Sequence, residues 1–454
     1  MKVLKFGGTS VGSATRIREV ARLVSQVEGR RIVVLSAMSG TTDTLVSLCE
    51  DISNGSWQKA EDTLAALQAK YWNVVDDLFE EESIRELAKT AIKPAFSELQ
   101  SQTRNENFTK NDEKVILSKG EIATVQLLLL TLSYYEGCTA EHLRSLSFMK
   151  IDHDSLPDTE YIQRHLRPLV DSFPDSNQLF VAEGYICVNA FGEVDNLRRG
   201  GSDYTATLIG EAVEAEEIQI WTDIDGLHDN DPRIVNVTRP VRRLHFGEAA
   251  ELAHFGAKIL HPACIEPARR GGIPVKLLNT LDPEARGTTI SSETGTTTVK
   301  AISAKDGVSV LTLSPHFSLN STPSLEDTIL VTTRLLEEYH LRADLVSSNG
   351  SSYLIAIEES DELDDFISNL KKRVRVEVQH GLSILAVVGD MSWENIGFET
   401  RILEALEDLP LRLVSYGSSR YSLVIAVATE DKGKALNALS RHLFKHLKLS
   451  LELE

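Results

Sequence analysis

The stretch KFGGTS, residues 5–10, follows directly on the short apolar run that opens the chain. Two adjacent glycines let a backbone turn sharply and let its N–H groups approach a ligand closely. A lysine beside such a turn adds a compact positive charge that suits phosphate. An ordinary turn between a strand and a helix would use the same glycines, so this hexapeptide alone leaves a structural and a phosphate-binding interpretation equally open.

The surrounding sequence predicts a parallel sheet. Residues 2–6 and 31–37 have the composition of buried strands, and the apolar residues between them recur at helical spacing. Two strands joined through a helix pair in parallel. Three later segments also resemble strands: 179–188, 217–226 and 273–279. We therefore expect an α/β domain over residues 1–295, with a polar helical insert at about 56–110.

The C-terminal third, residues 296–454, contains an internal repeat. The stretches LVSSNGSSYLIAI (345–357) and LVSYGSSRYSLVIAV (413–427) are similar, and each follows a predicted strand and a predicted helix. We expect two copies of one β-α-β unit, the first at about 308–378 and the second at about 380–448. A duplicated α+β module attached to an α/β domain suggests regulation, although duplication alone can be structural.

The composition narrows the class of protein. At 454 residues the chain is too long for one ordinary domain, and 42% hydrophobic and 25% charged residues are typical of globular proteins. Lysine and arginine total 47 against 67 for aspartate and glutamate, and the net charge of −20 argues against a nucleic-acid partner. The four cysteines form no C-x-x-C pair, which predicts free thiols in a reducing cytoplasm. The longest apolar run, near residues 125–132, is too short to span a bilayer, so we expect no membrane partner.

Nucleotide-binding fingerprints of the commonest kinds do not fit. Ser13 stands where a P-loop beginning at Gly7 would need a lysine. Five other stretches cluster polar side chains: LSAMSGTTD (35–43), SKGE (118–121), RRGGSD (198–203), WTDIDGLHDNDPR (221–233) and HFGAKILHP (254–262). Taken singly, glycine turns and aspartate-rich loops are most often structural.

The combination of these stretches favours a ligand site. Lys258 alone would be a surface lysine, and His254 and His261, predicted to share a helix face, lack the i, i+4 spacing of a zinc site. However, two lysines, an arginine and several glycine turns fall at predicted strand ends, where open parallel sheets bind ligands. Such cations suit a triphosphate, and a separate set of Glu, Arg and Asp suits a zwitterion.

The order of these motifs resembles that of the aspartate kinases, and the C-terminal repeat is similar to their paired ACT modules. The resemblance covers essentially the whole chain and includes KFGGTSV, SKGE, RRGGSDYTA, ELAHFGAKILHP and GTTI. It implies the amino acid kinase fold, a mainly parallel central sheet between helices, followed by a tandem ACT region of ferredoxin-like α+β modules. It also implies transfer of a phosphoryl group from ATP, carried with Mg²⁺ held mainly by its phosphates, to L-aspartate.

The resemblance implies roles for individual residues. The catalytic residues would be Lys5, Lys258 and Asp203. The aspartate-binding residues would be Ser36, Thr42, Glu121, Tyr185, Arg199 and Ser202. The nucleotide side would comprise Gly7, Gly8, Thr222, Asp223, His228, Arg233 and Lys258. Glu121 would bind the α-ammonium group, and Arg199 would bind a carboxylate in bidentate fashion.

The predicted regulatory site lies in the first repeat and comprises Asp344, Ser347, Ser348 and Asn349. Small hydroxyls and backbone N–H groups can hold the carboxylate of an amino acid, and Asp344 can hold a cationic group. We expect L-lysine to be the feedback effector, with threonine as the alternative. We also expect a homodimer or higher oligomer through the ACT modules.

Four residues depart from the usual family pattern, and they concern substrate and nucleotide contacts: Cys187, Asn196, Arg198 and His228. The first repeat also lacks the usual Gly-Phe of the effector stretch. Three alternatives therefore accompany the kinase interpretation: a kinase for another acidic amino acid, a non-catalytic amino-acid sensor, and a fragment of a fused kinase–homoserine dehydrogenase.

Overall fold

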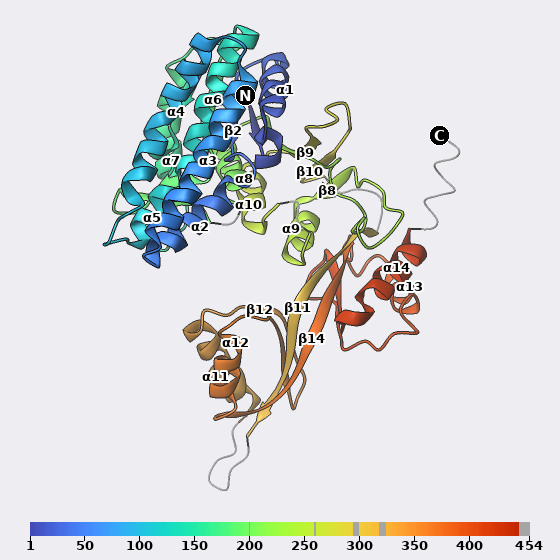
Figure 1. The fold of residues 1–454 in the computed structure, drawn as a ribbon. Coiled ribbons are helices and arrows are strands. Elements are labelled where there is room, and N and C mark those ends of the chain that lie inside the picture. The colour runs from blue at the N-terminus through green and yellow to red at the C-terminus, as the bar shows by residue number, and fades with distance from the viewer. Residues whose placement is uncertain (199, 258–259, 294–298, 317–323, 445–454) are drawn as a thin grey trace, which may run out of the picture. The chain divides into compact units, whose positions relative to one another are not determined.

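The computed structural model describes residues 1–198, 200–257, 260–293, 299–316 and 324–444. The chain divides into two compact units (Figure 1), which are treated separately. The first unit comprises 1–227, 242–246 and 259–294. The second unit comprises 228–241, 247–258 and 295–454.

The first unit is built on an eight-stranded sheet. Across the sheet the strands are β3 (Ala140–Leu143), β4 (Leu179–Glu183), β2 (Arg31–Leu35), β1 (Lys2–Phe6), β7 (Glu217–Thr222), β9 (Val275–Asn279), β10 (Thr288–Ser291) and β8 (Arg243–His245). All neighbours pair in parallel except β9 and β10. The prediction of a mainly parallel sheet is therefore confirmed. A two-stranded ribbon of β5 (Ile186–Val188) and β6 (Val194–Asn196) accompanies this sheet.

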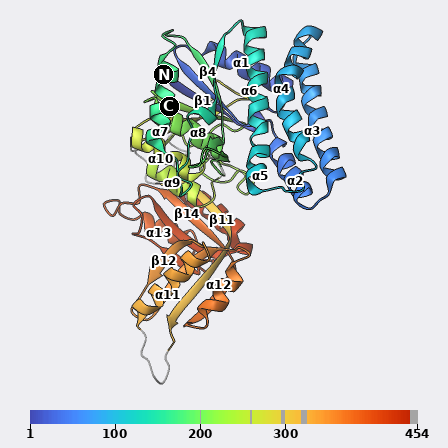
Figure 2. The same ribbon diagram turned by 90° about the vertical axis from the view of Figure 1, so that its left-hand side faces the viewer.

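Helices cover both faces of the sheet (Figure 2). One layer contains α1 (Ala14–Gln26), α2 (Thr41–Ser53), α3 (Trp57–Leu78), α4 (Glu82–Gln102), α5 (Lys110–Leu117) and α6 (Lys119–Glu136). The other layer contains α7 (Thr159–Asp171), α8 (Gly201–Ala212) and α10 (Pro262–Gly271). Two short 3₁₀ turns, η1 (Gly8–Val11) and η2 (Ser145–Ser147), follow β1 and β3.

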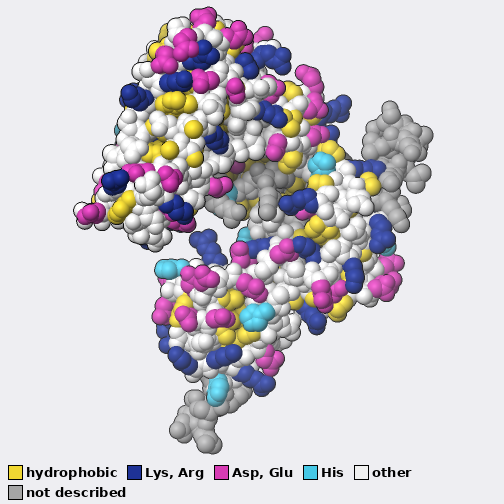
Figure 3. All heavy atoms as spheres, viewed as in Figure 1, with side chains coloured by type: hydrophobic (Ala, Val, Ile, Leu, Met, Phe, Trp, Pro, Cys, Tyr) yellow, Lys and Arg dark blue, Asp and Glu magenta, His cyan; other side chains and the backbone are white. Residues whose placement is uncertain are grey.

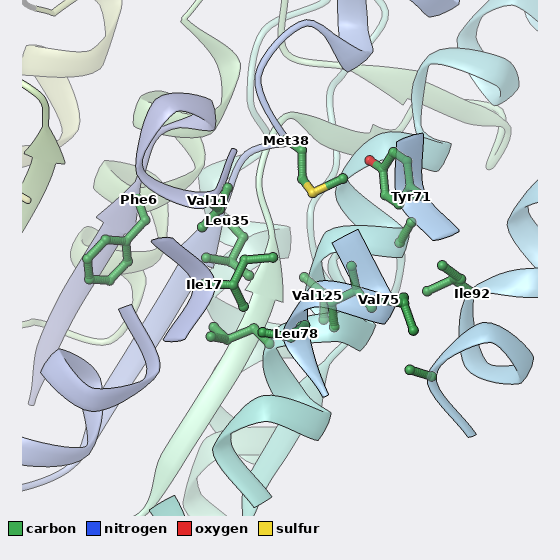
Figure 4. Close-up of a cluster of buried hydrophobic side chains, with 14 of the residues drawn as sticks. Phe6, Val11, Ile17, Leu35, Met38, Tyr71, Val75, Leu78, Ile92 and Val125 are labelled. Carbon is green, nitrogen blue, oxygen red and sulfur yellow. The ribbon is translucent and has the colours of Figure 1, made fainter. Parts of the chain in front are cut away.

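The core of the first unit lies between the sheet and the layer of α1 to α6. Phe6 and Leu35 from the sheet, Tyr71 from α3 and Val125 from α6 belong to one buried cluster (Figure 4). Residues Lys110–Glu136 are long and apolar enough by themselves to cross a membrane, but 72% of the most apolar window is buried inside the structure. This stretch is longer than the apolar run expected from the sequence, and its burial is that of a core helix.

The second unit contains a six-stranded antiparallel sheet with two long central strands, β11 (Val299–Pro315) and β14 (Val374–Gly389). The flanking strands are β13 (Tyr353–Glu358) and β12 (Ala343–Ser348) beside β11, and β16 (Ser422–Ala428) and β15 (Leu413–Ser415) beside β14. The helices are α11 (Leu325–Glu338), α12 (Leu363–Leu370), α13 (Phe398–Glu404) and α14 (Lys432–Leu443), with a short 3₁₀ turn η3 (Thr429–Asp431) before α14.

The order of elements from β11 to α12 is repeated from β14 to α14, as expected for a duplicated α+β module. Each half has its own buried cluster, one around Leu311 and Phe366 and one around Leu385 and Ile425. On the face in Figure 3, acidic and basic side chains are mixed over both units, so the net negative charge is not gathered in one patch of that face.

Two local predictions were wrong. The strand expected at 179–188 is interrupted after Glu183, because Tyr185 has a left-handed φ of 71° between β4 and β5. His254 and His261 do not share a helix face. Helix α9 (Phe246–His254) ends at His254, Gly256 has a φ of 99°, and His261 caps the start of α10.

Leu128 tests how much the helical layer contributes to stability. Its side chain is fully buried on α6, whereas Leu87 on α4 is 52% exposed. Leu128→Ala should lower the free energy of unfolding by about 2–5 kcal/mol, because it removes buried methyl groups and leaves a cavity. Leu87→Ala, the matched control, should change it by less than about 0.5 kcal/mol. Urea unfolding followed by tryptophan fluorescence measures both, and equal effects would contradict this packing.

Candidate active site

A buried ion pair lies at the carboxyl ends of the central parallel strands. Lys5 is 8% exposed and occupies the penultimate position of β1, opposite Val34 of β2 and Ile220 of β7. Its Nζ is 2.6 Å from Oδ1 of Asp203, in the first turn of α8. No hydrogen bond to this Asp203 oxygen is found among the described residues, so its polar contact is the ion pair with Lys5. The pair holds a charged ammonium group at the sheet edge where α/β proteins bind ligands.

The two glycines after β1 bring two predicted motifs together. A Cβ atom on Gly8 would lie only 2.8 Å from the carbonyl oxygen of Ala37, and the N–H of Ser39 donates to Gly8 O at 3.1 Å. A Cβ atom on Gly7 would lie 3.5 Å from Lys5 Nζ. The N–H of Ser36 donates to Phe6 O at 3.1 Å, which places this predicted substrate residue beside β1. The glycines therefore permit close packing around the lysine, as the opening hexapeptide suggested.

Glu121 is a buried carboxyl group near this pair. It lies in the first turn of α6, is 4% exposed, and its Oε2 has no hydrogen-bond partner among the described residues. Burial raises the pKa of Glu121 to about 8, with a further contribution from Glu183, while the backbone of Ala37 and the charge of Lys5 act in the opposite direction. A buried carboxyl oxygen without a partner fits a cationic ligand group.

The turn that carries Tyr185, between β4 and β5, packs against the start of α8, which carries Ser202. Gly184 and Gly201 allow this, because a Cβ on either would lie 2.6 Å from a side-chain carbon of Ser202 or Tyr185, respectively. The N–H of Tyr185 donates to Thr205 Oγ1 at 2.9 Å, which fixes the turn against α8. Burial, with a smaller effect of Glu121, raises the pKa of Tyr185. Ser202 thus lies on α8, the helix that carries Asp203, and the Tyr185 turn is held against that helix.

Several other predicted residues that the structure describes make no hydrogen bond or ion pair with Lys5, Glu121 or Asp203. Thr42 is exposed at the start of α2, and Asp223 is exposed just after β7. Thr222 ends β7, and its Oγ1 accepts a hydrogen bond from Ile224 N at 3.3 Å. Arg199 and Lys258 lie outside the described residues.

The other two predicted nucleotide residues belong to the second unit. His228 Nδ1 is 2.7 Å from Thr238 Oγ1. The guanidinium group of Arg233 is bound by both carboxylate oxygens of Asp231, at 2.9 and 2.7 Å.

The predicted regulatory residues lie on β12 and in the turn that follows it. Ser347, Ser348 and Asn349 are exposed, and the Asn349 side-chain oxygen accepts hydrogen bonds from backbone N–H groups of the same turn. The Asp344 side chain is only 7% exposed and is ion-paired with Lys305.

Sequence reasoning missed a buried network behind Glu121. Glu183 is 3% exposed, contacts His142 Nε2 at 2.5 Å, and accepts a hydrogen bond from Ser145 N at 2.9 Å. The available signal was an acidic residue that ends an otherwise apolar strand, since a charge at such a position needs partners.

Comparison with known proteins supplies the family. The profile of the amino acid kinase family matches residues 1–279, and that of an ACT domain matches residues 385–443. The chain belongs to the amino acid kinase family. This amino acid kinase is 29% identical to the lysine-sensitive aspartokinase 3 of Escherichia coli K12, over 98% of this chain and 99% of that protein. It is 28% identical to the aspartokinase of Chlamydia pneumoniae, over 94% of each chain.

Solved structures give the same result. The kinase matches E. coli aspartokinase III in complex with aspartate and ADP, with a TM-score of 0.83 and 27% identity over 98% of this chain and 100% of the other. It matches the same enzyme in complex with lysine and aspartate with a TM-score of 0.76 and 28% identity, over 98% and 99%. The predicted resemblance to aspartate kinases and the predicted fold class are confirmed.

The raised pKa of Glu121 predicts a pH-dependent stability. Between about pH 4.5 and pH 8 the folded state binds more protons than the unfolded chain, so this residue lowers stability as the pH rises through that window. Glu121→Gln removes the buried charge. The variant should be more stable than the wild type at pH 8.5 by more than about 1 kcal/mol, the free energy of one pKa unit.

Thermal unfolding at pH 5 and pH 8.5, without ligands, measures this effect. The advantage of Glu121→Gln should shrink at pH 5, and Glu106→Gln at an exposed position serves as the control. A stability difference that is the same at both pH values would mean that Glu121 does not ionise in a buried environment.

Proposed function

We propose that this chain is an aspartate kinase, which transfers the γ-phosphoryl group of ATP to the side-chain carboxylate of L-aspartate to give 4-phospho-L-aspartate and ADP. The observation that carries the proposal is the Lys5–Asp203 pair at the carboxyl end of β1. It is supported by similarity along 98% of the chain to an aspartokinase whose crystal structure contains aspartate and ADP.

The chemistry requires positioning and positive charge more than proton transfer. One carboxylate oxygen of aspartate attacks the γ-phosphorus, the bond to the bridging oxygen of the β-phosphate breaks, and ADP leaves with that electron pair. No general base is needed, because the attacking carboxylate is already ionised at pH 7. Lys5 neutralises charge on the transferring group, and Asp203 keeps the ammonium group in place. The backbone N–H of Gly8 approaches the same oxygens, whereas the N–H of Gly7 already donates to the Trp221 carbonyl at 3.3 Å.

Mg²⁺ would accompany ATP and reduce the charge on its phosphate oxygens. The described residues contain no group of three or more His, Cys, Asp or Glu side chains arranged for a metal. The proposal places the Mg²⁺ mainly on the nucleotide phosphates. The nucleotide itself is assigned to Thr222, Asp223, His228, Arg233 and Lys258.

Aspartate is assigned to the residues around Glu121. The unpartnered Oε2 of Glu121 would bind the α-ammonium group, and that contact would lower the raised pKa of this carboxyl group. Arg199 would bind a carboxylate of aspartate in bidentate fashion. The remaining contacts are assigned to hydroxyl groups near these residues: Ser36, Thr42, Tyr185 and Ser202.

Regulation is assigned to the region 296–454, with the catalytic domain at 1–295. Lysine is the proposed feedback effector, because the E. coli relative is described as lysine-sensitive and its structure has been solved with lysine. The predicted contacts are Asp344, Ser347, Ser348 and Asn349. We also propose a cytoplasmic enzyme that assembles through its ACT modules.

A coupled assay of ADP release tests this function. Purified protein should turn over with L-aspartate, much less with L-glutamate, and more slowly when lysine is added. Faster turnover with another acidic amino acid would replace aspartate as substrate. No turnover with any of them, combined with calorimetric binding of lysine or threonine, would support a non-catalytic sensor instead.

Lys5→Ala tests the catalytic assignment. Loss of a charge that acts in the transition state should lower kcat by roughly 10²–10³-fold, equivalent to about 2.7–4 kcal/mol, with little change in the KM for aspartate. Lys2→Ala, at the other end of the same strand, should retain normal kcat. A Lys5→Ala enzyme with near-normal kcat would exclude this residue from the mechanism.

A further inference from the structure

Three charged residues of the first ACT-like module form a cluster that the sequence did not predict. Lys305 Nζ lies 2.7 Å from Asp344 Oδ2 and 2.9 Å from Glu358 Oε2. The Lys305 and Asp344 side chains are only 17% and 7% exposed, whereas Glu358 is 66% exposed. The Lys305 ammonium group is therefore already paired with Asp344, the carboxylate that was expected to bind the cationic group of an effector.

The strands are irregular at the positions that bring these side chains together. Asp344 is the extra residue where the pairing of β12 with β13 shifts register, between Ala343 and Leu345. The pairing of β11 with β14 shifts directly after Lys305. Register shifts of this kind bend a strand and redirect its side chains. As a result, Lys305 on β11 reaches across the end of β13 to β12 on the sheet edge.

The contact is strong enough to keep the lysine charged. Burial disfavours the charged form of Lys305, but the hydrogen bonds that Lys305 donates to the Asp344 and Glu358 carboxylates, together with their negative charges, outweigh burial and raise the pKa of Lys305. The other oxygen of Asp344, Oδ1, lies 3.4 Å from His254 Nε2 at the end of α9 in the same unit. Both oxygens of Asp344 thus already have nitrogen neighbours, and the positive charge of Lys305 disfavours a second ammonium group at the same carboxylate.

We propose that Lys305 competes for the Asp344 carboxylate with any amino acid whose side chain ends in an ammonium group. Lys305 thereby sets the concentration at which such an amino acid can bind there. The inference rests on the proposed feedback regulation. A site whose binding-competent form is only a fraction of the population binds its ligand more weakly by that fraction. In a variant without Lys305, the Asp344 carboxylate is always available to the ligand. Such a variant also leaves two carboxylates that face a vacated ammonium position.

Calorimetric titration of the full-length protein tests the competition. L-lysine is compared with L-norleucine, which has the same backbone groups and the same four side-chain carbons but no terminal ammonium group. Lys305→Met should bind L-lysine at least about tenfold more tightly than the wild type, as expected if Lys305 occupies Asp344 more than about nine-tenths of the time. Binding of L-norleucine should be unchanged.

A matched control and a second variant guard against effects on folding. Lys432, 20% exposed, pairs with Asp306 at 2.5 Å in the same unit, and Lys432→Met should leave lysine binding as in the wild type. Glu358→Gln weakens the hold on Lys305 without touching Lys305 or Asp344. It should tighten lysine binding in the same direction by a smaller factor.

Two results would overturn the inference. One is unchanged or weaker lysine binding in both Lys305→Met and Glu358→Gln, including a complete absence of binding. The other is equal tightening for L-lysine and L-norleucine, which would show that the terminal ammonium group is not what competes. Because the readout is binding, it is independent of turnover. A wild-type protein that fails to phosphorylate aspartate would end the proposed function while leaving this test valid.

Discussion

The ion pair between Lys5 and Asp203 is the constraint on which the rest of the first unit depends. Its two partners come from the central strand β1 and from helix α8, so the distance of 2.6 Å requires both elements to be fixed. Taking either partner away would leave a buried charge without compensation, which is strongly unfavourable. The sheet, the glycine turn after β1 and the packing of α8 together fix the Lys5 ammonium group at the strand ends before any ligand binds.

Two carboxyl groups of this site differ in their partners. Asp203 is matched by an ammonium group of the protein, whereas Glu121 has an oxygen without a partner and a pKa raised to about 8 by burial. In the proposed function, this contrast separates Asp203, which would position Lys5, from Glu121, which would bind the α-ammonium group of aspartate. In the second unit, Asp344 resembles Asp203 rather than Glu121, because it is paired with a lysine of the chain.

Periodicity and turn chemistry were sufficient to predict the β1–α1–β2 start, the mainly parallel sheet and the duplicated module, because each depends on local sequence. The break at Tyr185 and the end of α9 before Gly256 were missed, since single left-handed residues override an apolar pattern. The contacts of Glu183 with His142 and of Lys305 with Asp344 link residues about 40 positions apart, and no spacing rule reveals them.

The central claim is that Lys5 acts on the transferring phosphoryl group rather than on bound ground-state ligands. The most direct measurement is the affinity for a transition-state mimic, MgADP with tetrafluoroaluminate and L-aspartate, compared with the separate affinities for MgADP and aspartate. Lys5→Ala should weaken the mimic by roughly 10²–10³-fold and leave the separate ligands nearly unchanged. Equal weakening of the mimic and the ground-state ligands, or no weakening at all, would contradict the account.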